Sequence, residues 1–118
     1  MKFFITKYLS KLYILHNLYF KHKYYLKRKS YSNSGEDLYI LSNFDKKGFY
    51  VDVGCHHPTR LNNCHLLYLN DWSGINIDPS EISIKLFDFA RKKDTNICSA
   101  VSLKKGLVDY YYHKPLSL

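Results

Sequence analysis

The chain has 118 residues and a formal net charge of +8 at pH 7. A chain of this length can bury one small core but not two. Hydrophobic residues make up 46% of it, which excludes an intrinsically disordered protein. Residues 1–30 carry eight Lys and Arg and no acidic residue, whereas residues 31–118 carry ten of each sign. The basic excess therefore belongs to an N-terminal arm (residues 1–30) and says little about the body of the protein (residues 31–118).

The arm has the periodicity of an amphipathic helix between residues 3 and 20. Apolar side chains recur there at spacings of three and four, and lysines fall on another face. The apolar positions are Phe4, Tyr8, Leu12, Leu15 and Tyr19. Polar and charged residues interrupt the segment, so we expect neither a transmembrane helix nor a signal peptide.

Three interpretations of the arm stay open. The helix packs on its own domain with a solvated basic face, or it makes peripheral contact with a membrane surface that carries anionic lipid. The third is nucleic-acid binding, in which lysines between Lys21 and Lys29 contact phosphates while Tyr24 and Tyr25 stack on bases. No nucleic-acid-binding motif accompanies these residues, so nucleic acid is the least favoured partner.

The body alternates between helix and strand patterns after a serine-rich joint at residues 30–34. A capping-box pattern at 34–37 precedes a short helix that ends near Phe44. We expect strands at 49–53, 74–77 and 95–101, a fourth β-rich run at 107–112, and helices at 62–69 and 80–92. This order predicts an α/β fold with a mostly parallel sheet of buried strands.

Three cysteines, Cys55, Cys64 and Cys98, do not make a disulfide framework, because the number is odd and two of them lie in segments with a buried pattern. Free cysteines are typical of a reducing compartment. We therefore expect a cytoplasmic protein, with membrane association through the arm as an open alternative.

Ligands of parallel sheets bind beyond the carboxyl ends of the strands. There Gly54 lets a ligand approach the backbone, and Asp78 offers a carboxylate to the two hydroxyls of a ribose. Each also has a structural explanation, since a glycine after a strand is often a turn and an acid there is often a helix cap. The later glycines of the dinucleotide fingerprint are absent, which favours a nucleoside without a pyrophosphate.

Five segments together carry a family resemblance. They are Ser32-Asn33-Ser34-Gly35-Glu36-Asp37, Tyr50-Val51-Asp52-Val53-Gly54-Cys55-His56-His57-Pro58, Asn62-Asn63, Trp72-Ser73-Gly74-Ile75-Asn76-Ile77-Asp78-Pro79 and Ala100-Val101-Ser102. Over about residues 31–112 the chain resembles the FkbM-type methyltransferases. The resemblance implies an S-adenosylmethionine-dependent enzyme with a Rossmann-like methyltransferase fold that O-methylates a hydroxyl of a sugar or related small molecule.

The resemblance also implies roles for single residues. The residues that match cofactor-binding positions are Asp52, Gly54, Cys55, His56, Asp78, Pro79, Ser99 and Ala100. His56 and His57 are candidates for the general base, because histidine titrates in the useful range, although shaping of the cofactor loop explains them equally well. Cys55 stands where the family commonly has Ala.

Two further expectations concern the extent of the domain and the binding of metal. Enzymes of this family continue through several more strands, so we expect residues 31–118 to be a truncated domain, and a non-catalytic remnant or cofactor-binding module is the alternative function. A basic membrane-surface or nucleic-acid-binding protein is a third. No metal is expected, because adjacent ligands seldom point at one ion. The side chains considered as zinc ligands are Cys55, His56, His57, Cys64 and His65.

Overall fold

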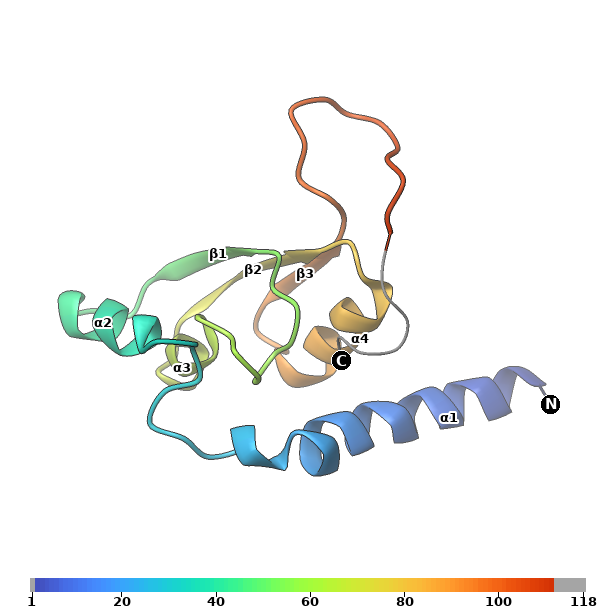
Figure 1. The fold of residues 1–118 in the computed structure, drawn as a ribbon, viewed down its shortest axis with the longest axis horizontal. Coiled ribbons are helices and arrows are strands. Elements are labelled where there is room, and N and C mark those ends of the chain that lie inside the picture. Colours follow the sequence, from blue (N-terminus) through green and yellow to red (C-terminus); the bar gives the residue numbers. More distant parts are fainter. Residues whose placement is uncertain (1, 112–118) are drawn as a thin grey trace.

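The computed structural model describes residues 2–111, with side chains from residue 6 onward, and it confirms the α/β class (Figure 1). In chain order the elements are α1 (Lys2–His16), the π-helical turn η1 (Asn17–Lys21), the 3-10 turn η2 (Lys23–Tyr25), α2 (Glu36–Asn43), β1 (Phe49–Val53), α3 (His65–Leu69), β2 (Ser73–Asp78), α4 (Glu81–Ala90) and β3 (Thr95–Cys98).

The three strands form one parallel sheet in the order β1-β2-β3. Right-handed crossovers between strands in this order place the connecting helices on the same face of the sheet. Figure 1 shows α3 and α4 on one side, together with α1 and α2, and no helix of residues 2–111 on the other. The sheet therefore has one covered face and one open face.

Side chains alternate between these two faces, as the period of a strand requires. The covered face carries Tyr50 and Asn76, which are buried. The open face carries Phe49, Val51 and Val53, which are 63%, 57% and 59% exposed. The prediction that strand 49–53 is buried on both sides is wrong, because no helix among residues 2–111 covers the open face.

Two small clusters make up the core of the body. Tyr50, Cys64, Leu67 and Trp72 pack together between β1 and α3. Cys55, Ile84 and Phe87 form the second cluster, beside α4. Cys55 and Cys64 are buried free thiols, and Cys98 is an exposed free thiol.

The arm contacts the body through the C-terminal part of α1 and through η1. Ile14 and Leu18 pack against Leu86, Phe89 and Ala90. The predicted face does not make this contact, because Tyr8, Leu12 and Tyr19 are 66%, 45% and 47% exposed. The arm thus packs on its own chain through a face one step round the helix from the one that its periodicity predicted.

The start of α2 differs from the predicted capping box. Gly35 occupies the N-cap position with a left-handed φ of 86° and offers no side chain. The hydroxyl of Ser32 accepts hydrogen bonds from the N–H groups of Gly35 and Asp37 instead. The buried Asp37 carboxylate accepts in turn from Ser30, Tyr31 and Ser32. Burial acts to raise the pKa of Asp37, but these hydrogen bonds outweigh it and hold the pKa below its usual value.

The C-terminal part of the predicted sheet is also shorter than expected. β3 ends at Cys98, so residues 99–101 leave the sheet. Residues 107–111 form no strand, and Tyr112 lies outside the described residues. Leu107 and Val108 are 103% and 63% exposed. A β-rich composition does not make a strand unless its backbone finds a partner for the ladder hydrogen bonds.

Candidate functional site at the carboxyl edge of the sheet

The loop that follows β1 is held against the end of β2. The N–H groups of Gly54 and Cys55 donate to the Ile77 carbonyl at 2.8 and 3.1 Å. Gly54 and His56 both have left-handed φ angles, of 72° and 56°. A Cβ built on Gly54 would meet no atom within 4 Å, so open space lies beside this backbone. The turn therefore leaves Gly54 exposed at the sheet edge, with space for a ligand beside its backbone.

Asp78 ties the ends of all three strands together. Its carboxylate accepts from the backbone N–H of His56 at 3.0 Å and of Ser80 at 2.8 Å. Its carbonyl accepts from the N–H of Ser99 at 3.1 Å. The side chain is nearly buried, at 7% exposed for the residue. Each carboxylate oxygen keeps a second lone pair, so Asp78 can accept further hydrogen bonds while it organises the loop and the start of α4.

The structure thus brings six of the eight predicted cofactor residues to one edge. These six are Gly54, His56, Asp78, Pro79, Ser99 and Ala100, and the last two are exposed. The side chains of Asp52 and Cys55 turn away from this edge. Cys55 lies in the core with Ile84 and Phe87, and Asp52 accepts from Nδ2 of Asn62 at 3.0 Å beneath the sheet. Burial raises the pKa of both groups.

His57 is fully buried beside the arm. Its Nδ1 accepts from the N–H groups of Thr59 and Arg60 at 3.1 and 3.0 Å, so Nε2 carries the proton and donates to Oδ1 of Asn17 at 2.8 Å. Burial, reinforced by the charges of His22 and other neighbours, lowers the pKa of His57 to about 3. Both ring nitrogens are occupied, so this environment favours a structural role over that of a general base.

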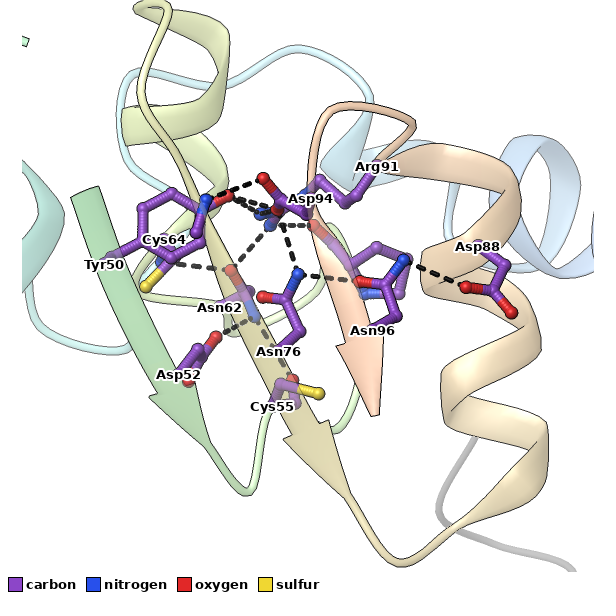
Figure 2. A network of polar contacts seen from close by, with 12 residues as sticks. Tyr50, Asp52, Cys55, Asn62, Cys64, Asn76, Asp88, Arg91, Asp94 and Asn96 are labelled. Carbon is purple, nitrogen blue, oxygen red and sulfur yellow. Dashed lines mark hydrogen bonds and ion pairs between the residues drawn. The ribbon is translucent and has the colours of Figure 1, made fainter. Parts of the chain in front are cut away.

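A buried polar network lies under the covered face and supports this edge (Figure 2). Arg91, just after α4, is fully buried, and its Nη1 donates to the Tyr50 hydroxyl at 2.8 Å and pairs with Asp94 at 3.4 Å. Its Nη2 donates to the Pro58 carbonyl and to Oδ1 of Asn62, both at 2.8 Å. Arg91 therefore holds both β1 and the loop that follows it.

Asp94 is the acidic centre of this network. It accepts from the backbone N–H of Gly74 and from Nδ2 of Asn76, both at 2.9 Å, and from the hydroxyl of Tyr50. Asn76 also donates to Oδ1 of Asn96 at 2.9 Å, while its own oxygen is buried without a partner. Burial raises the pKa of Tyr50, so the phenol stays neutral. The network couples the amino ends of the three strands.

Asn62 connects the network to the candidate site. Its Nδ2 donates to Asp52 at 3.0 Å and to the Cys55 carbonyl at 3.2 Å, while its Oδ1 accepts from Arg91. No role was predicted for Arg91 or Asp94, because Arg91 begins a basic run with Lys92 and Lys93 and resembles a solvated helix end. The one sequence signal was an Asp directly before a strand.

The side chains considered as zinc ligands belong to separate environments. Cys55 and Cys64 lie in different core clusters, and burial raises the pKa of Cys64 to about 12. Among residues 2–111 no group of three His, Cys, Asp or Glu side chains is arranged to hold a metal ion. A cavity of about 250 Å³ lies between α1 and α4, and its lining residues are not predicted cofactor residues. They are Ser10, Tyr13, Ile14, Ile82 and Lys85.

Comparison with protein-family models, with curated proteins and with solved structures finds no match to this chain.

Proposed function

We propose that the carboxyl edge of this sheet binds S-adenosylmethionine and that the chain is part of an FkbM-type, Rossmann-like O-methyltransferase. The acceptor is a hydroxyl of a sugar or a related small molecule. The observation that carries the proposal is the convergence of Gly54, Asp78 and Ser99 at one edge of a parallel sheet. An accessible turn, a carboxylate and a small-residue strand end are the groups that a nucleoside without a pyrophosphate requires.

Asp78 is the central binding residue in this proposal. Its carboxylate accepts hydrogen bonds from the ribose hydroxyls with the lone pairs that His56 and Ser80 leave available. The loop from Gly54 to His56 lies along the methionine portion, and Ser99 and Ala100 lie beside adenine. Asp52 and Cys55 then act indirectly, by fixing the loop through Asn62 and the core.

The test is calorimetric titration of the full chain with S-adenosylhomocysteine. We expect saturable binding in the wild type and an at least about tenfold weaker affinity in Asp78→Asn, since a hydrogen bond to a charged group contributes about 1.5–3 kcal/mol. Ala100→Trp blocks the adenine side, and Leu103→Trp is its matched control because Leu103 is fully exposed further along the same segment. An absence of binding by a folded wild-type chain would contradict the proposal.

One observation favours a second candidate, a module that binds the cofactor without transferring the methyl group. The occupied nitrogens of His57 leave it without a free acceptor for a substrate proton. Under this alternative the calorimetric result is unchanged, but no labelled methyl group moves from S-adenosylmethionine to a panel of saccharide acceptors. Methyl transfer that survives His57→Gln would leave the methyltransferase standing and remove His57 as its base.

A further inference from the structure

The side of α1 and η1 that faces away from the body is mostly apolar, and its exposed polar residue His16 stacks on Phe20. We call its apolar part the outer stripe, and it consists of Tyr8, Leu9, Leu12, Tyr19 and Phe20, which are 66%, 56%, 45%, 47% and 69% exposed. Figure 1 shows α1 along the edge of the molecule, far from the sheet. In a soluble amphipathic helix such a stripe turns toward the core. Here Ile14 and Leu18 contact α4, and the outer stripe is left without cover among the described residues.

Basic side chains accompany the outer stripe. Exposed lysines lie along the arm, among them Lys7, Lys11, Lys23, Lys27 and Lys29. Residues 1–30 contain no Asp or Glu, so no carboxylate within the arm offsets this charge. An exposed apolar stripe and uncompensated positive charge therefore occur on the same segment.

These two features together identify the kind of partner. Nucleic acid matches the lysines, but it leaves Leu9 and Leu12 without a contact, because bases stack on aromatic rings rather than on aliphatic side chains. A second copy of the chain would bring two like-charged arms together. A lipid surface with anionic headgroups satisfies both features, since the stripe enters the acyl boundary while lysines stay at the headgroups.

We propose that the arm is an interfacial anchor that lies on an anionic lipid surface, with the outer stripe immersed and the lysines among the headgroups. Among residues 2–111 no helix is long and apolar enough to cross a membrane, so the contact is peripheral. Ile14, Leu18 and Asn17 would hold the body against the anchored helix. This inference does not depend on the proposed methyltransferase activity, because none of its residues lies at the carboxyl edge of the sheet.

The experiment is flotation of the full chain with vesicles of phosphatidylcholine, with and without phosphatidylserine. We expect binding at least about tenfold stronger with phosphatidylserine, and weaker as salt is raised. The double variant Leu9→Ser/Leu12→Ser should lower binding to the anionic vesicles about tenfold or more, since two apolar side chains no longer leave water. Its matched control is Leu103→Ser/Leu107→Ser, which alters two fully exposed leucines outside the arm.

Two double variants test the contribution of the arm's positive charge. Lys23→Gln/Lys27→Gln should remove most of the preference for phosphatidylserine, whereas Lys46→Gln/Lys47→Gln, which changes two exposed lysines of the body, should keep it. The variant Tyr8→Trp tests whether the outer stripe enters the lipid. Its tryptophan fluorescence should be quenched by lipids brominated in the acyl chain. Circular dichroism establishes that each variant is folded.

Three results would overturn the anchor. The first is equal binding to neutral and anionic vesicles. The second is a Leu9→Ser/Leu12→Ser variant that binds vesicles as well as the wild type. A wild-type chain that is a dimer in gel filtration, with a monomeric Leu9→Ser/Leu12→Ser variant, would likewise overturn the anchor and identify a second copy as the occupant. The third is tighter binding to a single-stranded oligonucleotide than to vesicles, lost in Lys23→Gln/Lys27→Gln alone, which would identify nucleic acid.

Discussion

The two faces of the sheet reverse the usual distribution of side chains. The covered face carries Tyr50, Asn76 and Asn96, joined to the buried pair Arg91–Asp94. The open face carries Phe49, Val51, Val53 and Ile97, which are 40% exposed or more. Hydrophobic burial therefore stabilises little of the open face. Beneath the covered face, a buried hydrogen-bond network holds the strands together in addition to the two small hydrophobic clusters.

This contrast predicts where substitutions will destabilise the protein most. A buried charge without its partner is costly, whereas an apolar side chain already in water loses little when it is replaced. We therefore expect large effects from substitutions on the covered side and small ones on the open face. The four predictions that follow test this contrast, from the largest effect to the smallest.

Arg91→Met should have the largest effect. It leaves the Asp94 carboxylate and the Asn62 and Pro58 oxygens buried without the guanidinium, which should lower the free energy of unfolding by about 3–5 kcal/mol. Urea unfolding followed by circular dichroism measures it, with the exposed Lys92→Met as control. An Arg91→Met protein as stable as the control would mean that the network does not hold the sheet.

Gly74→Ala should come next. Gly74 lies on the covered face of β2, where an added Cβ would collide with the carbonyl oxygen and ring of Tyr50. Overpacking of this kind costs about 1–3 kcal/mol. The comparison variant is Gly54→Ala, whose Cβ would meet nothing but whose left-handed φ disfavours Ala by about 1 kcal/mol. The same unfolding assay ranks the two, and the reverse order would place the strain at the loop rather than under the sheet.

The buried histidines should make stability depend on pH. The folded pKa of His57 and of His65 is lowered to about 3, mainly by burial, so between pH 3 and 6.5 the unfolded chain binds more protons than the folded one. Stability should therefore fall as pH decreases through this window. Each histidine should cost about 1.5 kcal/mol between pH 6.5 and 5.

Unfolding midpoints at pH 7, 6 and 5 measure this dependence. His57→Gln removes one of the two protonation sites, so its midpoint should change less with pH than that of the wild type, even though it is less stable at pH 7. Lys85, an exposed residue of α4, provides Lys85→Gln as a control that keeps the wild-type dependence. An identical slope in His57→Gln and wild type would show that His57 is not the neutral buried group described above.

Val51→Thr on the open face should have the smallest effect. Val51 is 57% exposed and opposite Ile75, so the change should alter the free energy of unfolding by no more than about 0.5 kcal/mol. It should also reduce self-association, because the substitution makes the exposed apolar surface of the open face smaller. Analytical ultracentrifugation measures this. A loss as large as that of Gly74→Ala would reveal that this face is covered in solution.

Local sequence pattern was sufficient to predict several features of the fold. The positions of β1, β2 and α4 followed from short apolar runs bounded by Gly48, Gly74 and Pro79, since these breakers act on their own neighbours. The meeting of Gly54, Asp78 and Ser99 followed from parallel topology, because the carboxyl ends of parallel strands share an edge. Whether that edge binds S-adenosylmethionine stays a prediction.

The tertiary structure alone decided which faces are buried. Helix periodicity groups the residues of one face of α1, but it does not say which face meets α4, because Ile14 and Leu18 pack against Leu86, Phe89 and Ala90 of a distant element. Likewise, nothing local distinguishes Arg91 from its neighbours Lys92 and Lys93. Its burial depends on Tyr50 and Asn62, which lie far from it in the sequence, as well as on Asp94 three residues away. Local sequence pattern determined where the helices and strands form, and long-range contacts determined which of their side chains are buried.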